Sequence, residues 1–154
     1  MSRLYPERPF LAASVAVFRD GRVLLAQRTG GAGAGTYSLP GGMVELGERL
    51  DQACLRELHE ETGVEADLLG FVDHVEVILR DADGRVRNHA AIAVFAARWR
   101  AGEGVTSTEA SDIRWVDPLA PGALPMTPNL PAVLRKADIS RESVRAPRRR
   151  WQRD

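Results

Sequence analysis

Acidic residues gather in one short segment of the chain, in a pattern that suits a divalent cation. Residues 42–64 read GMVELGERLDQACLRELHEETGV, and the second half carries Glu57, Glu60 and Glu61 within five residues. Like charges three and four apart on a helix repel each other, whereas hard divalent ions prefer oxygen ligands. The clustering therefore predicts a magnesium site, and the chemistry that such a site favours is reaction at a phosphate group.

A helix over residues 48–62 would place these glutamates at the border of the protein core. At about 100° per residue they share one arc of the helix. The neighbouring arc is apolar and contains Leu50, Cys54, Leu55 and Leu58. The outer face would carry Gln52, Arg56 and His59. A solvated acidic face is the ordinary alternative, but the position beside the core, after a Pro-Gly-Gly turn that allows close backbone approach, favours a ligand site.

The remaining pattern predicts a sheet that would position this helix. Apolar, β-branched runs bounded by turn residues predict strands, at residues 11–18, 22–27, 43–46, 68–80, 88–100 and 113–116. A glycine-rich loop occupies residues 30–35, and a second, shorter helix is expected at 129–137. Gly63 is a natural end for the first helix. The order strands, helix, strands, helix predicts an α/β domain with a mixed sheet flanked by helices.

Length and composition limit the class of protein. A chain of 154 residues predicts one domain with a buried core. Cys54 is the sole cysteine, which excludes an intrachain disulfide and suits a reducing compartment. No apolar run reaches the roughly 18 residues of a membrane span, so we expect a cytoplasmic protein with no membrane partner.

The charge is unevenly distributed along a chain whose formal net charge is zero. Basic side chains dominate the last twenty or so residues, and most of them are arginines. We assign residues 1–139 to the domain and residues 140–154 to a basic tail that we expect to be flexible. Attraction of nucleic acid or an anionic substrate to this tail is the alternative.

Residues 42–64 resemble the Nudix box, whose pattern is Gly-x5-Glu-x7-Arg-Glu-U-x-Glu-Glu-x-Gly-U, with U a bulky aliphatic residue. Every fixed position is satisfied, by Gly42, Glu48, Arg56, Glu57, Leu58, Glu60, Glu61, Gly63 and Val64. The lead-in from Tyr37 to Gly42 is also similar, although the family usually has tryptophan where Tyr37 stands. The resemblance extends over roughly residues 11–135 and is nearest to MutT-like and bacterial ADP-ribose pyrophosphatase-like members. It implies a Nudix-type α/β/α sandwich with a central mixed β-sheet.

The resemblance also implies a diphosphatase that requires Mg²⁺ or Mn²⁺. Such an enzyme cleaves the pyrophosphate bond of a nucleoside diphosphate linked to another group. The implied metal ligands are Glu57, Glu60 (directly or through water), Glu61 and the carbonyl of Gly41. Glu48 would assist at the metal or hold Arg56, and Arg56 would orient the carboxylates. The general base stays open between Glu57 and Glu109.

Two further residues are candidates for contact with substrate. Arg28 ends the second expected strand and could grip phosphate with two donors, with a surface salt bridge as the alternative. Tyr37 could stack on a nucleotide base, with a place in the core as the alternative.

ADP-ribose is the expected substrate, because the stretch after the box is similar to ADP-ribose pyrophosphatase-like members. A MutT-type pyrophosphatase acting on (oxidised) nucleoside triphosphates is the alternative. It stays open because no proline occurs between Pro40 and Pro118, where some ADP-ribose hydrolases carry one. A non-catalytic module that binds nucleotide or RNA is a further alternative. The expected partner is a small nucleotide rather than nucleic acid, and a homodimer stays open.

Overall fold

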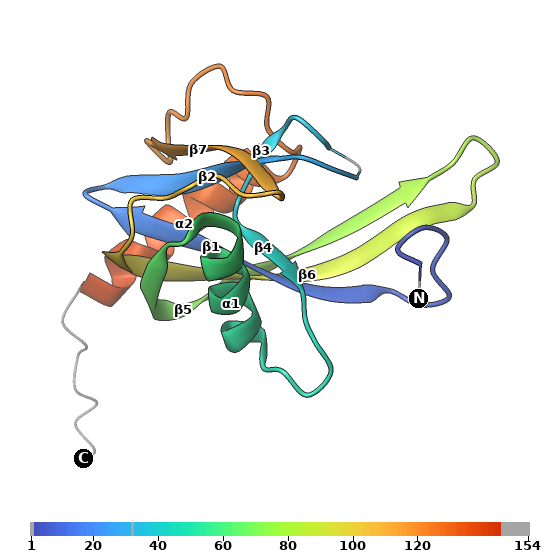
Figure 1. Cartoon of the computed structure of the whole chain (residues 1–154), viewed down its shortest axis with the longest axis horizontal. Coiled ribbons are helices and arrows are strands. Elements are labelled where there is room, and N and C mark those ends of the chain that lie inside the picture. The colour runs from blue at the N-terminus through green and yellow to red at the C-terminus, as the bar shows by residue number, and fades with distance from the viewer. Residues whose placement is uncertain (1, 32, 146–154) are drawn as a thin grey trace, which may run out of the picture.

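In the part of the chain that the structure describes, a single mixed sheet lies between two helices (Figure 1). The computed structural model describes residues 2–31 and 33–145. Its strands are β1 (Phe10–Arg19), β2 (Arg22–Arg28), β3 (Tyr37–Ser38), β4 (Gly41–Met43), β5 (Glu65–Arg80), β6 (Val86–Ala101) and β7 (Ala110–Val116). The helices are α1 (Leu50–Thr62) and α2 (Leu130–Arg145). No helix in the described residues has the length and apolarity needed to cross a membrane.

Strand β1 lies at the centre of the sheet. The strand order is β3-β2-β1-β6-β5, with β4 paired to β1 and β7 paired to β2. β1 runs parallel to β6, whereas the other pairs are antiparallel. The predicted mixed sheet is therefore confirmed.

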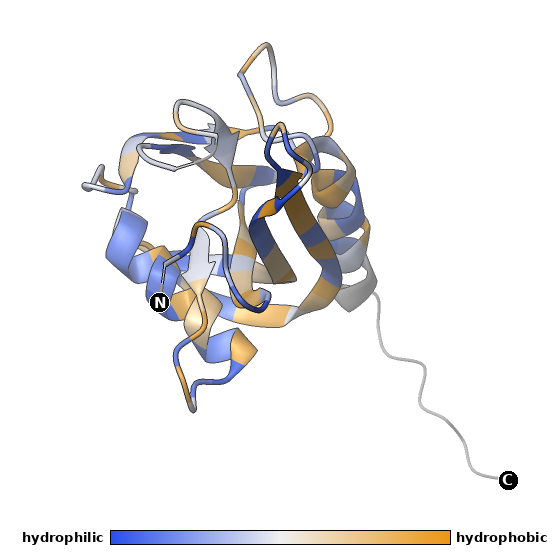
Figure 2. Ribbon diagram, turned by 90° about the vertical axis from the view of Figure 1, so that its right-hand side faces the viewer, coloured by the Kyte–Doolittle hydropathy of each residue, from blue (hydrophilic) through white to orange (hydrophobic). Residues whose placement is uncertain are grey.

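The two helices cover opposite faces of the sheet. Successive side chains of a strand point to opposite sides, so one strand can contribute to the core beneath each helix. Val15 and Val17 of β1 pack in one core with residues of α1, such as Leu58. Phe18 of β1 packs in the other core with residues of α2, such as Leu134. β1 is accordingly buried at successive positions along most of its length, and Figure 2 shows many apolar residues along the strands. This arrangement confirms the predicted α/β/α sandwich.

The ends of several elements differ from the sequence-based expectation. β4 begins at Gly41 rather than Met43, because the glycine pair lies against Ala13 and Ser14 of β1. β5 and β7 also begin earlier than expected, at Glu65 and Ala110. Pairing with β6 and β2 extends them beyond the apolar residues from which they were predicted.

Helix α2 is longer than the sequence indicated. It continues to Arg145, so the first residues of the expected basic tail are helical. Arg141 explains part of the extension, because its guanidinium pairs with Asp138 at 2.6 Å and lies over the ring of Phe18 at 4.7 Å. Residues 146–154 of the tail, for which flexibility was predicted, lie outside the described residues.

Candidate metal centre

Helix α1 carries the acidic residues, and local interactions fix both of its ends. The backbone N–H of Arg49, the N-cap residue, donates to the side chain of Gln52 at 3.2 Å. Gly63 adopts φ 70°, and its N–H donates to the carbonyl of His59 at 2.9 Å. The helix therefore ends where the sequence predicted, with Leu58 turned into the core.

Three carboxylates converge between α1 and the segment that leads into β7. One oxygen each of Glu57, Glu61 and Glu109 lies within 4.8 Å of the others. The two box glutamates are partly buried and Glu109 is exposed. The structure thus brings the predicted residues Glu57 and Glu61 together with the predicted loop acid Glu109, although about fifty residues separate them along the chain. No other group of this kind occurs among residues 2–31 and 33–145.

This cluster holds more negative charge than its surroundings compensate. The pKa of Glu61 is raised to about 8, chiefly by burial and also by the neighbouring charges of Glu57 and Glu109. The backbone amide of Gly41 and the charge of Arg28 act in the opposite direction. Burial also raises the pKa of Glu57. Carboxylates that resist ionisation for these reasons ionise readily beside a cation, and their hard oxygen atoms fit Mg²⁺ or Mn²⁺.

The Pro-Gly-Gly turn allows this crowding. A Cβ atom at Gly42 would lie 2.4 Å from the carboxyl carbon of Glu57. A Cβ atom at Gly41 would lie 2.4 Å from the carbonyl oxygen of Ala13. The sequence predicted close backbone approach to a ligand, and the structure shows that the close approach at Gly42 is to Glu57 itself. Any side chain at this position would displace that carboxylate.

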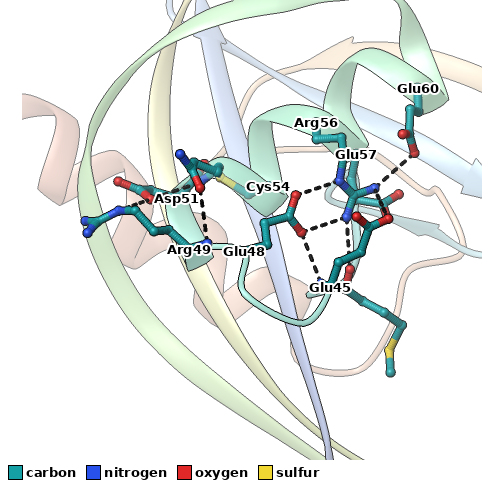
Figure 3. A network of polar contacts seen from close by, with 10 residues as sticks. Glu45, Glu48, Arg49, Asp51, Cys54, Arg56, Glu57 and Glu60 are labelled. Atoms are coloured by element: carbon teal, nitrogen blue, oxygen red, sulfur yellow. Dashed lines mark hydrogen bonds and ion pairs between the residues drawn. The ribbon is translucent and has the colours of Figure 1, made fainter.

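Arg56 connects the carboxylates around the start of α1 (Figure 3). It donates to both carboxylate oxygens of Glu48, at 2.7 and 2.9 Å, and to the carbonyl of Met43 at 3.1 Å. It also donates to Glu57 at 3.0 Å and to Glu60 at 3.1 Å. The hydrogen bonds from Arg56, with a further one from the backbone N–H of Glu45, lower the pKa of Glu48 to about 2. Of the two roles considered for Glu48, the geometry favours holding Arg56.

One expectation for α1 needs correction. The helical wheel placed Arg56 on the outer face, but its side chain folds back across the helix and is only 24% exposed. The length of the arginine side chain lets the guanidinium reach a face that its Cα does not occupy. Glu60, for which contact with a metal directly or through water was predicted, pairs with Arg56 at 3.1 Å and is 56% exposed; its role at the metal stays a prediction.

The family model for the NUDIX domain matches residues 8–137, which include this cluster and the sheet that supports it. The chain belongs to the Nudix family. A solved structure, the MutT NUDIX hydrolase from Burkholderia pseudomallei, superposes on this Nudix chain with a TM-score of 0.71 and 29% sequence identity. The match covers 84% of this chain and 98% of that one.

Two curated relatives share part of their length with this Nudix chain. The ADP-ribose pyrophosphatase of Methanocaldococcus jannaschii is 31% identical over 115 residues, which are 75% of this chain and 65% of that protein. A MutT-like protein of Streptomyces ambofaciens is 34% identical over 106 residues, which are 69% of this chain and 62% of that protein. The chain therefore spans slightly less than two thirds of the length of either relative.

The two predicted substrate contacts of the Nudix domain differ in their surroundings. Arg28 is exposed at the end of β2, opposite Ala110 of β7, and its charge acts on Glu61. Tyr37 is only 4% exposed, packs in the core beneath α2 and donates its hydroxyl to Asp112. Its burial supports the alternative of a core aromatic residue and leaves no free ring face for a base.

Polar side chains that the sequence analysis missed tie the glycine-rich loop to the segment carrying Glu109. Thr29 donates its hydroxyl to the carbonyl of Thr108 at 2.7 Å. Ser111 donates to the side chain of Gln27 at 3.1 Å, and Gln27 donates to the carbonyl of Gly35 at 2.9 Å. No sequence signal marks these residues, because hydroxyl and amide side chains are common in loops.

Proposed function

We propose that this Nudix protein hydrolyses the pyrophosphate bond of a nucleoside diphosphate linked to another group, with the help of Mg²⁺ or Mn²⁺. The convergence of Glu57, Glu61 and Glu109 is the observation that carries the proposal. Two carboxyl groups with raised pKa values, Glu57 and Glu61, together with the exposed side chains of Glu109 and Arg28, suit a cation and a polyphosphate together.

The residues of this chain would divide the work of binding the metal. Glu57 and Glu61 would supply carboxylate oxygens, and the carbonyl of Gly41 would complete the site. Arg56 would keep the carboxylate of Glu57 in one orientation, because it already donates to that group and is itself held by Glu48. A bound divalent ion neutralises phosphate charge and lowers the pKa of coordinated water.

Of the two candidate bases, Glu109 fits the surroundings better. The carboxylate of Glu57 accepts a hydrogen bond from Arg56 at 3.0 Å, which stabilises its charged form. The carboxylate of Glu109 is exposed and has no side-chain donor among the described residues. A general base needs a free lone pair within hydrogen-bond reach of the attacking water. We therefore propose that Glu109 is the base that accepts the proton of this water.

ADP-ribose is the substrate that we propose, with AMP and ribose 5-phosphate as products. The support is the likeness to the protein from M. jannaschii that is named an ADP-ribose pyrophosphatase. A nucleoside triphosphate pyrophosphatase of the MutT type is the second candidate, favoured by the likeness to the MutT-like protein of S. ambofaciens. Both reactions need the same metal cluster and differ in the group beyond the diphosphate.

A panel of substrates tests the proposal directly. It contains ADP-ribose, other ADP- and GDP-sugars, dinucleoside polyphosphates and normal and oxidised nucleoside triphosphates, each with Mg²⁺ and with Mn²⁺. We expect metal-dependent release of AMP from ADP-ribose, loss of release in Glu61→Gln, and unchanged release in Glu65→Gln, which alters an exposed glutamate on β5. Turnover of triphosphates alone would select the second candidate. Wild-type protein that turns over no substrate would instead indicate a non-catalytic module.

A further inference from the structure

The outer part of the β5–β6 hairpin is covered along one edge and open along the other. The hairpin extends away from the rest of the molecule in Figure 1, and β1 pairs with β6 only from Ala90 onward. Beyond that point the N-terminal segment covers the edge of β6. The N–H of Tyr5 donates to the carbonyl of Arg87 at 2.9 Å, and Asn88 donates to the carbonyl of Arg3 at 3.4 Å. β5 pairs only with β6 among the described strands, so its other edge is open.

Apolar side chains accompany this open edge. Val75, Val77 and Leu79 share one face, since alternate residues of a strand point the same way, and Val75 packs in the core beneath α2. Leu79 is 40% exposed, and Ile78 on the opposite face is 45% exposed. A long, apolar, unpaired edge tends to pair with another chain unless charges oppose it. The spacing of the charged residues along β5 therefore decides whether, and in which register, this edge can pair with another chain.

We propose that the outer part of β5 pairs antiparallel with β5 of a second copy of this chain, about a twofold axis that passes through Ile78. A twofold axis perpendicular to the sheet keeps each face on its own side, and the contact is the same for both copies. In this register Glu76 lies opposite Arg80 of the second copy, and Val77 lies opposite Leu79 of the second copy. The pairing thus places opposite charges together on one face and apolar residues together on the other.

The spacing of the charges selects this register over its neighbours. An axis through Glu76 would place two glutamates opposite each other, and an axis through Leu79 would place Ile78 opposite Arg80. An axis through Val77 would place Ile78 opposite Glu76. The axis through Ile78 also brings the turn at residues 81–84 of the second copy toward a hollow of about 250 Å³ between β5 and α2, lined in part by His74 and Lys136. The second copy would thus lie beside this hollow as well as along the edge.

Charge reversal on the full chain tests the interface by sedimentation velocity across a range of protein concentrations. We expect a dimer for the wild type, and a dissociation constant at least about tenfold higher for Glu76→Arg or Arg80→Glu, because like charges then face each other twice. The double variant Glu76→Arg/Arg80→Glu restores opposite charges and should return to within about threefold of the wild type. Glu65→Arg, at the other end of β5, is the matched control and should leave the dimer unchanged.

A cysteine at the axis tests the register. Directly opposed residues of antiparallel strands have Cα atoms about 4.5–5.5 Å apart, which suits a disulfide. Ile78→Cys should therefore form a covalent dimer under mild oxidation, whereas Asp83→Cys, in the turn of the same hairpin, should not. The natural Cys54 is buried and will not interfere. A wild type that stays monomeric, a dimer insensitive to both charge reversals, or no cross-link at position 78 would each overturn the proposal.

Discussion

Replacing Glu61 by glutamine should change how the stability of the metal-free protein depends on pH. Burial is the main cause that raises the pKa of Glu61 to about 8 in the folded chain, from an ordinary value of 4.5. Between these values the unfolded chain has lost the proton that the folded chain retains. The folded state is therefore most favoured at low pH, and the free energy of unfolding falls as pH rises toward 8. Glutamine has no proton to lose, so the variant should lack this fall.

The size of the effect follows from the shift. One unit of pKa corresponds to about 1.4 kcal/mol, so we expect stability to fall by roughly 1.4 kcal/mol per pH unit, or about 3 kcal/mol between pH 5.5 and pH 7.5. Glu57 and Glu109 share the cluster, so the proton belongs to the group of three as much as to Glu61. Carboxylates with a lowered pKa, such as Glu48, affect stability only below about pH 4.5 and do not contribute in this window.

Urea unfolding in the presence of a chelator measures the effect at each pH. The wild type and the control Glu65→Gln should lose stability across the window, whereas Glu61→Gln should show a nearly flat profile. Saturating Mg²⁺ should remove the loss in the wild type, because a cation favours the ionised carboxylates and binds only the folded site. A flat wild-type profile, or an equal slope in Glu61→Gln, would refute the reasoning that burial of this carboxylate opposes its charge.

Three more substitutions test separate parts of the site. Gly42→Ala should weaken Mg²⁺ binding by about tenfold or more in calorimetry, because its Cβ displaces Glu57. Gly30→Ala, which has open space around it, should not weaken binding. Arg56→Lys should lower kcat/KM about a hundredfold, since lysine cannot hold both oxygens of Glu48 while fixing the metal-binding carboxylate; Arg100→Lys on β6 is the control. Glu109→Gln should lower kcat by about 10²- to 10⁴-fold and alter Mg²⁺ affinity less than Glu61→Gln does. If Glu109→Gln weakened Mg²⁺ binding as much as Glu61→Gln, Glu109 would be a ligand rather than the base.

The sequence predicted the parts of the fold that depend on local pattern. The apolar stripe through Cys54 and Leu58 and the glycine at position 63 predicted α1, and the packing of Cys54 and Leu58 in one core confirms its orientation. The hairpin of β1 and β2 followed from a turn at residues 19–21 between apolar runs. These features were predictable because each is decided by neighbours along the chain or by the period of the element.

Side-chain direction across elements was not predictable in the same way. Arg56 was expected to face outward, because a helical wheel describes the Cα position and not the reach of a long side chain. Glu109 could be named only as a candidate, since its approach to Glu61 depends on how β7 pairs with β2. The end of α2 was missed because the contact of Arg141 with Phe18 joins residues far apart in sequence.

The third carboxylate of the cluster, Glu109, comes from outside the helix that carries the other two. Glu109 directly precedes β7, a strand that is joined to the sheet only through β2 among the described strands. A molecule in which β7 has detached would retain helix α1 and both of its inward glutamates, yet present an incomplete centre. With Glu109 as the proposed base, the rate of hydrolysis would therefore scale with the fraction of molecules in which this outer strand is docked. Local opening at the margin of the sheet, with the helix intact, would thus lower the proposed activity while leaving Glu57 and Glu61 in place.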